Sequence, residues 1–215
     1  MVNQNQDETN AKPSIIILSF IFLIPIFGCN ERDRPDQITD SPENIYASFD
    51  KANHLQPVID KQQFDTSHKW EFGWNLLNPI NIAPDKEIEK HLSRRLSPGQ
   101  KALYFFWYLD AEVTNGGFIQ FYWNDYRIYL PPINKGLKLI GDSAMLQLIE
   151  KVDKEYTKNQ SAFKKQKLKD DWSPLYENLK QFDEYDSTYY IIHDRTMDLI
   201  EKYARQNPEE FAKFN

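Results

Sequence analysis

The residues of this chain that could do chemistry surround a double glycine, in the stretch Glu112-Val-Thr-Asn115-Gly116-Gly117-Phe118. Glu112 could act as a general acid or base, and the glycine amides could bind an anion, which would make a small hydrolytic pocket. A phosphate-binding loop would need a strand before it and a Lys-Ser/Thr pair after it, and neither is present. The alternative, which we favour, is a corner between two helices whose polar side chains satisfy the free amides of the turn.

The single cysteine, Cys29, stands at a second junction of chemical interest. A mainly apolar run at 14–27 is shorter than the roughly 20 residues that cross a bilayer as a helix, and it is typical of a secretory signal. Ile26-Phe27-Gly28-Cys29 follows at once and resembles a bacterial lipobox, in which cleavage before the cysteine leaves a thiol that takes up lipid. We therefore expect a signal peptide over 1–28, lipid on Cys29, and a charged, flexible tether over 29–42.

The leader departs from the usual lipoprotein pattern in two ways. It carries Asp7 and Glu8 with one lysine, Lys12, and Phe27 is bulky for its position. An uncleaved apolar anchor, or a free cysteine, is the alternative. The lipoprotein interpretation predicts a membrane partner in the bacterial cell envelope, held through palmitate-type acyl chains, because several chains anchor stably where one is marginal. One cysteine excludes an intramolecular disulfide and any multi-cysteine metal site.

The four histidines do not form a recognisable site in the sequence. His54 and His68 lack a partner at metal-ligand spacing, and His91, which could pair with Glu87 across one turn, is expected on the surface. His193 precedes Asp194, but neighbours on a helix do not face one another, and no serine or cysteine nucleophile stands in a recognisable elbow. We therefore expect no metal, no cofactor and no catalytic residue, with His193 at the edge of the core.

The element that must position the glycine corner is the segment Ser97–Asn124. Ser97 can cap a helix start, Pro98 suits its first position, and Gln100 can close a capping box. The double glycine then breaks the run, because glycine accepts a positive φ. Apolar residues recur at helical spacing on both sides of the break; they are Ala102, Phe105, Phe106, Leu109 and Val113 before it, and Phe118, Phe121 and Tyr122 after it.

Further helices are predicted on both sides of this segment. A short amphipathic helix through Ile45, Tyr46, Phe49 and Ala52, one helix over 64–78, one over 133–140 ended by Gly141, one capped by Asp142, and one over 172–185 are expected. In the charged segment 85–96, Ile88, Leu92 and Leu96 are expected to form the inner face. Ser187 is expected to cap a last long helix that ends at Asn207-Pro208.

The lysines gather in one region of the chain. Lys151–Lys169 contains seven of them, and 157–171 is the least hydrophobic part of the expected domain. We expect 157–171 to be an exposed loop or a frayed helix end. The alternative is a lysine patch that touches anionic lipid near the anchor.

These patterns predict an all-α fold: a single compact multi-helix bundle over 43–215, with the Asn-Gly-Gly corner between two core helices. Aromatic residues make up 14% of the chain, which favours a buried core, and 7 glycines are few for a turn-rich β fold. The formal net charge is −6. Direct nucleic-acid binding is therefore not expected, because it requires a basic face.

Several of these residues resemble the signature of a known bacterial family, the DNA-mimic protein 19-like family. The resemblance rests on Glu112, Asn115-Gly116-Gly117-Phe118, Gln120 and Asn124, with support from Gly136-Leu-Lys-Leu-Ile-Gly141 and Phe182-Asp183-Glu184-Tyr185, and it covers about 86–203. It implies an all-helical fold without a known catalytic site. The family name implies an acidic surface that occupies a DNA-binding protein.

Three functions from different classes follow. The first, which we favour at this point, is a membrane-tethered, non-enzymatic domain that binds an unknown protein partner. The second is DNA mimicry, for which Asp183, Glu184 and Asp186 form an acidic cluster. The seven lysines before that cluster, and export as a lipoprotein, count against it. The third is an enzyme that uses Glu112 and Asp110 near the glycine corner, although no nucleophile or metal set stands nearby in the sequence.

Overall fold

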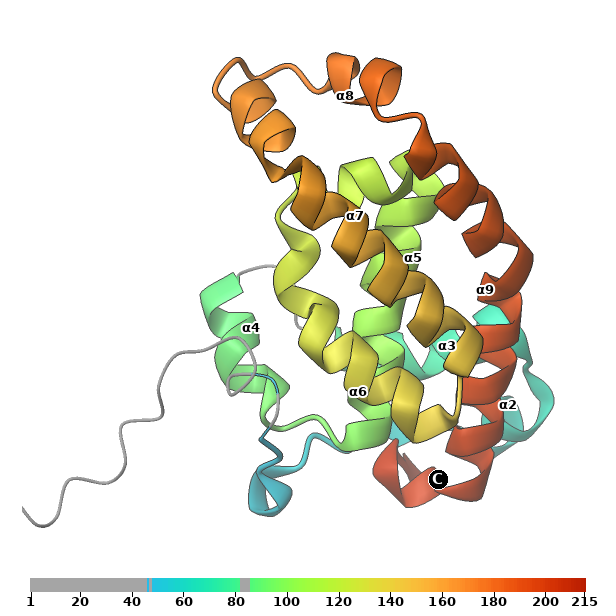
Figure 1. Ribbon diagram of the computed structural model, residues 1–215. Coiled ribbons are helices and arrows are strands. Elements are labelled where there is room, and N and C mark those ends of the chain that lie inside the picture. The colour runs from blue at the N-terminus through green and yellow to red at the C-terminus, as the bar shows by residue number, and fades with distance from the viewer. Residues whose placement is uncertain (1–45, 47, 82–85) are drawn as a thin grey trace, which may run out of the picture. The chain divides into compact units, whose positions relative to one another are not determined.

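The long helix α5 (Pro98–Trp123) lies at the centre of the protein, and the other long helices pack around it (Figure 1). The structure is a computed structural model that describes residue 46, residues 48–81 and residues 86–215. The described residues belong to one compact unit, Ile38–Asn215. The predicted signal peptide, Cys29 and the predicted tether lie outside the described residues.

The start of α5 is built as its sequence predicts. The amide of Gln100 donates to Ser97 Oγ (3.0 Å), and the amide of Ser97 donates to Gln100 Oε1 (2.9 Å). Pro98 occupies the first position of the helix. This reciprocal capping satisfies two helix-end amides in a buried environment, where an unpaired amide would be costly.

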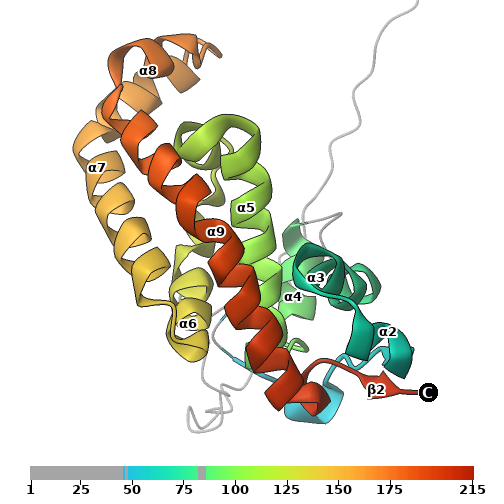
Figure 2. The same cartoon turned by 90° about the vertical axis from the view of Figure 1, so that its right-hand side faces the viewer.

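Two groups of helices flank the central pair α5 and α9 (Gln181–Gln206), as Figure 2 shows. On one side lie α6 (Leu130–Ile140) and α7 (Ser143–Lys167), and on the other α2 (Lys61–Thr66) and α3 (Lys69–Leu77). The short α8 (Ser173–Asn178) joins α7 to α9 at the far end, and α4 (Lys86–Ser93) precedes α5. Short 3-10 turns occupy Lys51–Asn53 (η1), Asn78–Ile80 (η2), Tyr126–Tyr129 (η3) and Pro208–Glu210 (η4).

The all-α prediction is confirmed, with one small addition. Val58–Ile59 (β1) and Lys213–Phe214 (β2) pair as a short parallel ladder, which ties the end of the chain to its first described segment. Gly141 ends α6 in the left-handed conformation (φ 76°), and the side chain of Asp142 caps α7 by accepting from the Met145 amide (3.1 Å), both as predicted. Within the described ranges, no helix combines the length and apolar character needed to cross a bilayer.

Two predicted helices near the first described residues are wrong in extent. Residues 48–50 are not helical, and a 3-10 turn, η1, stands where the end of the amphipathic helix was expected. The helix predicted over 64–78 is split at Ser67–His68 into α2 and α3. The split lets Phe64 of α2 and Phe72 of α3 meet in the core, with ring centroids 5.2 Å apart.

The inner face predicted for the segment before α5 is wrong at Ile88, whose side chain is 50% exposed, whereas its neighbour Glu89 is 1% exposed. Two tyrosines make this burial possible. The hydroxyl of Tyr104 donates to Glu89 Oε1 (2.7 Å), and the hydroxyl of Tyr129 donates to Glu89 Oε2 (2.6 Å). Burial, together with the adjacent carboxylate, raises the pKa of both phenols, so each stays a donor.

Residues 157–167 form the last turns of α7, so the predicted exposed loop is wrong, and the helix end given as its alternative is present but packed against the core. The reason is Phe163, which is buried against Tyr122 of α5 and Phe182 of α9, with ring centroids 6.3 and 6.2 Å away. Burial of Phe163 alone holds the last turns of α7 against the core, although the residues around it are polar. The lysines around Phe163 extend into solvent.

Ser187 does not begin the last helix. α9 starts six residues earlier, at Gln181, after a break at Leu179–Lys180 that ends the predicted helix over 172–185. Phe182 and Tyr189 are both buried and lie about two turns apart on the same side of α9. The apolar stripe therefore continues past Ser187 without interruption. The Ser187 hydroxyl instead donates to the carbonyl of Asp183 (2.7 Å), the bond that a serine makes inside a helix.

Candidate functional site

The double glycine kinks α5 without separating it into two elements. Gly116 and Gly117 have non-helical backbone angles, and Gly117 adopts φ 71° and ψ −178°. A side chain is disfavoured there by the backbone alone. A Cβ at Gly117 would also lie 2.2 Å from the Oδ2 atom of Asp186. The corner between two core helices is therefore present, in the form of a kink within one long helix.

The polar residues around the kink bind one another across it. Glu112 Oε2 accepts hydrogen bonds from Gln120 Nε2 (3.0 Å) and from Asn124 Nδ2 (2.8 Å). Gln120 Oε1 in turn accepts from Asn115 Nδ2 (2.9 Å). We call these four residues the kink clasp. The clasp connects the turn before Gly116 with the two turns after Phe118, and it engages the Glu112 carboxylate through two amide groups.

The anion at the glycine corner is supplied by the protein itself. The amide of Phe118, directly after the kink, donates to Asp186 Oδ1 of α9 (2.8 Å). Burial, with a further contribution from Asp183, raises the pKa of Asp186 to about 6. The Tyr176 hydroxyl of α8 donates to the carbonyl of Gly116 (2.6 Å). The predicted acidic cluster is therefore divided: Asp183 and Glu184 are exposed, and Asp186 turns inward to the kink.

Asp110, which we considered together with Glu112, faces a different set of partners. Its Oδ1 atom accepts from the Tyr189 hydroxyl (3.0 Å) and lies 2.9 Å from His193 Nδ1. Burial raises the pKa of Asp110, although both hydrogen bonds oppose the rise. His193 therefore lies at the edge of the core with a partner from α5, as predicted. The contacts described for His193 involve no serine or cysteine, so they offer no nucleophile.

The expectation that His193 and Asp194 stay apart is wrong. His193 Nε2 lies 3.9 Å from Asp194 Oδ1, because Asp194 is drawn to the Trp70 side of α9. The indole of Trp70 donates to the same oxygen of Asp194 (2.7 Å), and its ring lies 5.6 Å from that of His193. Sequence reasoning missed this contact because Trp70 is 124 positions away.

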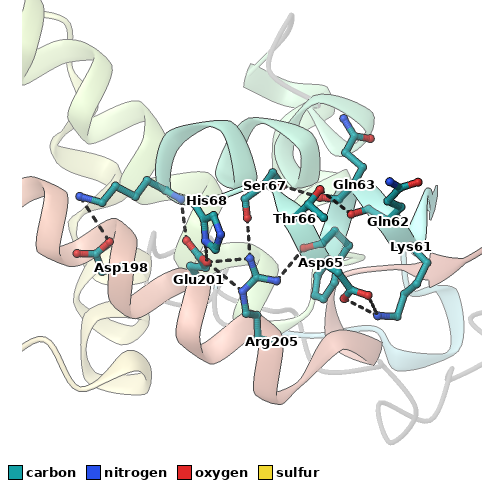
Figure 3. Close-up of polar contacts among 12 residues, drawn as sticks. Lys61, Gln62, Gln63, Asp65, Thr66, Ser67, His68, Asp198, Glu201 and Arg205 are labelled. Atoms are coloured by element: carbon teal, nitrogen blue, oxygen red, sulfur yellow. Dashed lines mark hydrogen bonds and ion pairs between the residues drawn. The ribbon is translucent and has the colours of Figure 1, made fainter.

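A further polar cluster joins the end of α9 to the turn between α2 and α3 (Figure 3). Glu201 accepts from Arg205 Nε (2.9 Å) and from the amide of Lys69 (2.7 Å), and its Oε1 atom lies 2.9 Å from His68 Nδ1. Arg205 also donates to the carbonyl of Ser67 (2.6 Å). Lys69 has φ 51°, rare for a residue with a side chain, and the bond to Glu201 holds it there. His68, isolated in the sequence, is thus part of a structural clasp.

The outward side of α9 carries a row of exposed residues that includes three acids. Glu184, Ser187, Ile191, Asp194 and Asp198 recur at intervals of three and four, which places them along one line of the helix. We call this row, with Tyr190 beside it, the α9 face. Its first and last carboxylates are separated by about 21 Å along the helix axis, at 1.5 Å per residue. Ile191 is 80% exposed and Tyr190 51% exposed between the acidic groups.

The seven lysines of Lys151–Lys169 lie on α7 and the turn after it, on a different element from the α9 face. Lys164, Lys165 and Lys167 occupy the last turn of α7, where positive charge favours the exposed carbonyls of a helix end. Lys167 Nζ contacts Asp125 Oδ1 (2.5 Å). Because these lysines lie on and just after α7 rather than on α9, the α9 face keeps its row of acids although the net charge of the chain is modest.

Among the described residues, no three His, Cys, Asp or Glu side chains gather in a way that could hold a metal ion. Cys29 and its predicted lipid lie outside this part of the chain.

Comparison with known proteins assigns the region that contains the kink clasp and the α9 face to a protein family. The pattern of the family described as DMP19-like protein matches residues 94–207, which is more than half of the chain. A relative from Neisseria meningitidis serogroup B, described as DNA mimic protein DMP19, is 28% identical over 122 residues, which is 54% of this chain and 73% of that protein. The family match spans α5 to the end of α9, close to the range expected from Glu112, Asn115-Gly116-Gly117-Phe118, Gln120 and Asn124. The chain belongs to the DMP19-like protein family.

Proposed function

We propose that this chain works by binding a DNA-binding protein, whose basic nucleic-acid site receives the α9 face in place of DNA. The observation that carries this proposal is the row of Glu184, Asp194 and Asp198, three exposed carboxylates on one line of a long helix. Two of them also contact α3, since Asp194 accepts from Trp70 Nε1 (2.7 Å) and Asp198 Oδ1 lies 4.0 Å from Lys69 Nζ. The description of the meningococcal relative as a DNA mimic supports it. The protein itself is not expected to bind nucleic acid through this face, since phosphates and carboxylates repel.

The rigidity of α9 makes its carboxylates suitable as substitutes for phosphates. The helix spans 26 residues and buries Phe182, Tyr189, Thr196 and Ile200 against the core. A partner therefore meets charges whose spacing is set before binding, so little conformational entropy is lost on association. The row of about 21 Å covers the length of about six phosphate steps of one DNA strand, at 3.4 Å each, and presents three carboxylates over that length.

The centre of the α9 face is apolar. Tyr190 and Ile191 lie between Glu184 and Asp194 and are largely exposed. Protein interfaces combine an apolar or aromatic centre with a polar rim, and the centre carries most of the binding free energy. The acids then steer a basic partner and set its orientation, while Tyr190 and Ile191 provide contact area.

A charge-neutral variant tests this proposal. Glu184→Gln, Asp194→Asn and Asp198→Asn together remove three charges from the α9 face. A matched control, Asp65→Asn, Glu150→Gln and Glu209→Gln, removes three exposed charges elsewhere. Partners are captured by crosslinking in intact cells, and each purified partner is tested for displacement of a labelled DNA duplex. We expect the chain and the control to displace the duplex and the α9 variant to lose at least tenfold in affinity.

The proposal fails if no captured partner binds DNA, or if the control variant loses affinity as much as the α9 variant does. A further variant, Ile191→Ser, tests the apolar centre. If it loses affinity for the partner and the charge-neutral variant does not, the contact is an ordinary apolar protein interface rather than mimicry of phosphates.

We also propose that the chain is a lipoprotein attached through Cys29, as the Ile26-Phe27-Gly28-Cys29 junction suggests. Labelled palmitate should attach to the chain, and Cys29→Ser should abolish labelling and release the domain from membranes. A chain that is never labelled and keeps its leader contradicts this proposal. A lipoprotein is exported, away from the DNA-binding proteins of the cytoplasm. If Cys29 carries lipid, the basic site that meets the α9 face therefore belongs to an envelope protein.

A further inference from the structure

A small pocket opens beside the start of α5, where that helix crosses α6. It has a volume of about 130 Å³. Two lysines line it, Lys101 from α5 and Lys135 from α6, and its other walls are mainly apolar. These walls are formed by Tyr46, Phe49, Pro98, Pro132, Gly136 and Leu139.

Lys101 is buried in a way that leaves its charge unmatched. Only 7% of the residue is exposed, and its ammonium group donates to the carbonyls of Tyr46 (2.9 Å) and Ser48 (2.5 Å). An ammonium group has three donors, so these neutral acceptors leave one donor proton. In the described ranges, neither Lys101 nor Lys135 forms an ion pair.

A third cation adds to this imbalance. Arg94, just after α4, acts electrostatically on Lys101, and its own Nε is buried without a hydrogen-bond partner among the described residues. Burial, followed by the nearby Lys135 and Arg94, lowers the pKa of Lys101 to about 8. Buried charges are normally paired, so a buried Lys101 that meets two neutral carbonyls and no described carboxylate, with the exposed Lys135 beside it in the pocket lining, is a costly arrangement. An anion in the pocket would balance the buried charge of Lys101.

We propose that this pocket binds a small organic carboxylate, whose charged group lies between Lys101 and Lys135 and whose apolar body packs against Phe49 and Leu139. The size of the pocket limits the ligand. An apolar cavity of about 150 Å³ accommodates benzene, so about 130 Å³ limits the apolar body to at most one small ring or a short hydrocarbon chain, with the carboxylate at the open side. Apolar walls favour a carboxylate with a hydrocarbon part over an inorganic anion, which would leave those walls without a partner.

Benzoate is a suitable probe, with benzamide as its neutral analogue and inorganic phosphate as an anion without an apolar body. Calorimetric titration of the full chain in mild detergent should show one site for benzoate, and binding at least tenfold weaker for benzamide and for phosphate. Benzoate affinity should fall as the pH rises through about 8, because Lys101 then loses its charge. Equal binding of phosphate, or no binding of benzoate, overturns the proposal.

Variants distinguish this pocket from non-specific binding. Lys135→Gln changes an exposed lysine of α6 at the pocket, and Lys138→Gln changes an exposed lysine of the same helix that does not line it. We expect the first variant to weaken benzoate binding at least fivefold and the second to leave it unchanged. Lys101→Met keeps the length of the buried side chain and should abolish binding; circular dichroism verifies its fold. If both glutamine variants behave alike, the site lies elsewhere.

A carboxylate of the chain itself is the competing occupant, and Asp40 and Glu43 are the nearest acids before Tyr46 in the sequence. The double variant Asp40→Asn, Glu43→Gln tests this possibility. If benzoate binds the double variant but not the parent chain, the pocket belongs to the chain's own acid and the proposal is wrong. Unchanged binding supports a separate ligand. Loss of this site would leave the proposal on the α9 face unaffected, because the two sites share no residue.

Discussion

Asp186 of α9 accepts a hydrogen bond of 2.8 Å from the amide of Phe118, the first residue after the kink of α5. The same carboxylate occupies the space into which a Cβ on Gly117 would point. The two helices of the centre are thus joined at the one place where the backbone of α5 departs from helical geometry. A corner that looked suited to a bound anion is closed by an acid 68 positions later in the chain.

The charge of Asp186 should make stability depend on pH. Its pKa is about 6 when folded against an ordinary 3.8, so between these values the folded state binds more protons than the unfolded state. Stability therefore rises as the pH falls from about 6 to 4, and ionisation at neutral pH is destabilising. Asp186→Asn keeps an oxygen for the Phe118 amide. It should raise the free energy of unfolding at pH 7 by on the order of 1 kcal/mol, after allowance for solvent screening.

Urea unfolding of the parent chain and Asp186→Asn from pH 4.5 to 7.5 measures this effect. The difference between them should shrink toward the acid end, because the parent is then protonated. A difference that stays constant across this range would show that Asp186 does not titrate as described.

Two glycines with positive φ should respond differently to alanine. Gly117 (φ 71°) has Asp186 Oδ2 at 2.2 Å from an added Cβ, whereas Gly141 (φ 76°) has nothing within 4 Å. Gly141→Ala should cost about 1 kcal/mol, from the backbone alone. Gly117→Ala should cost about 2 kcal/mol more, because the α5–α9 contact must also open. Urea unfolding compares the two variants, and equal losses would contradict the close approach of Asp186.

The kink clasp should appear as a coupling between Glu112 and Asn124, which lie on opposite sides of the kink. Glu112→Ala, Asn124→Ala and the double variant form a thermodynamic cycle. We expect a coupling free energy of about 1 kcal/mol from their hydrogen bond to a charged oxygen. The pair Glu112 and Glu150 serves as the uncoupled control, since Glu150 lies on the exposed side of α7. Additive losses for Glu112 and Asn124 would mean that the clasp contributes no stability.

Removal of the buried Glu89 carboxylate should destabilise the protein, because its oxygens accept hydrogen bonds from two tyrosine hydroxyls. Glu89→Leu leaves the hydroxyls of Tyr104 and Tyr129 without their acceptor in the core and should cost about 3 kcal/mol. Adding Tyr104→Phe and Tyr129→Phe removes those hydroxyls and should recover part of the loss. Thermal unfolding of the single and triple variants measures the recovery. A triple variant less stable than Glu89→Leu would refute this explanation.

Local chemistry made several parts of the fold predictable. The capping box of Ser97 and Gln100, the stop at Gly141 and the cap at Asp142 each depend on residues within four positions. Their hydrogen bonds are satisfied by the nearest backbone, whatever else the chain does. The apolar spacing of α5 likewise predicted that this helix packs against other elements, but it did not identify those elements.

Where a local sequence signal conflicted with burial of apolar side chains, burial determined the structure. Ser187 has the chemistry of a cap, yet Phe182 and Tyr189 carry the helix through it, because burial of two aromatic rings outweighs one capping bond. Ile88 and Glu89 exchanged their expected places for a related reason: the tyrosines that satisfy Glu89 come from α5 and η3.

The sequence by itself determined the helical class, the caps at Ser97 and Asp142, the glycine kink and the family, because these depend on the types and spacing of neighbouring residues. The tertiary structure decided what each charged group does. It turned Asp186 inward and left Glu184, Asp194 and Asp198 exposed, with Trp70 beside Asp194 and Lys69 beside Asp198, although all four acids lie on one helix. Adjacent positions on a helix differ by about 100° in direction, so only the packing of α9 on α5 determines which carboxylates are buried and which a partner can reach.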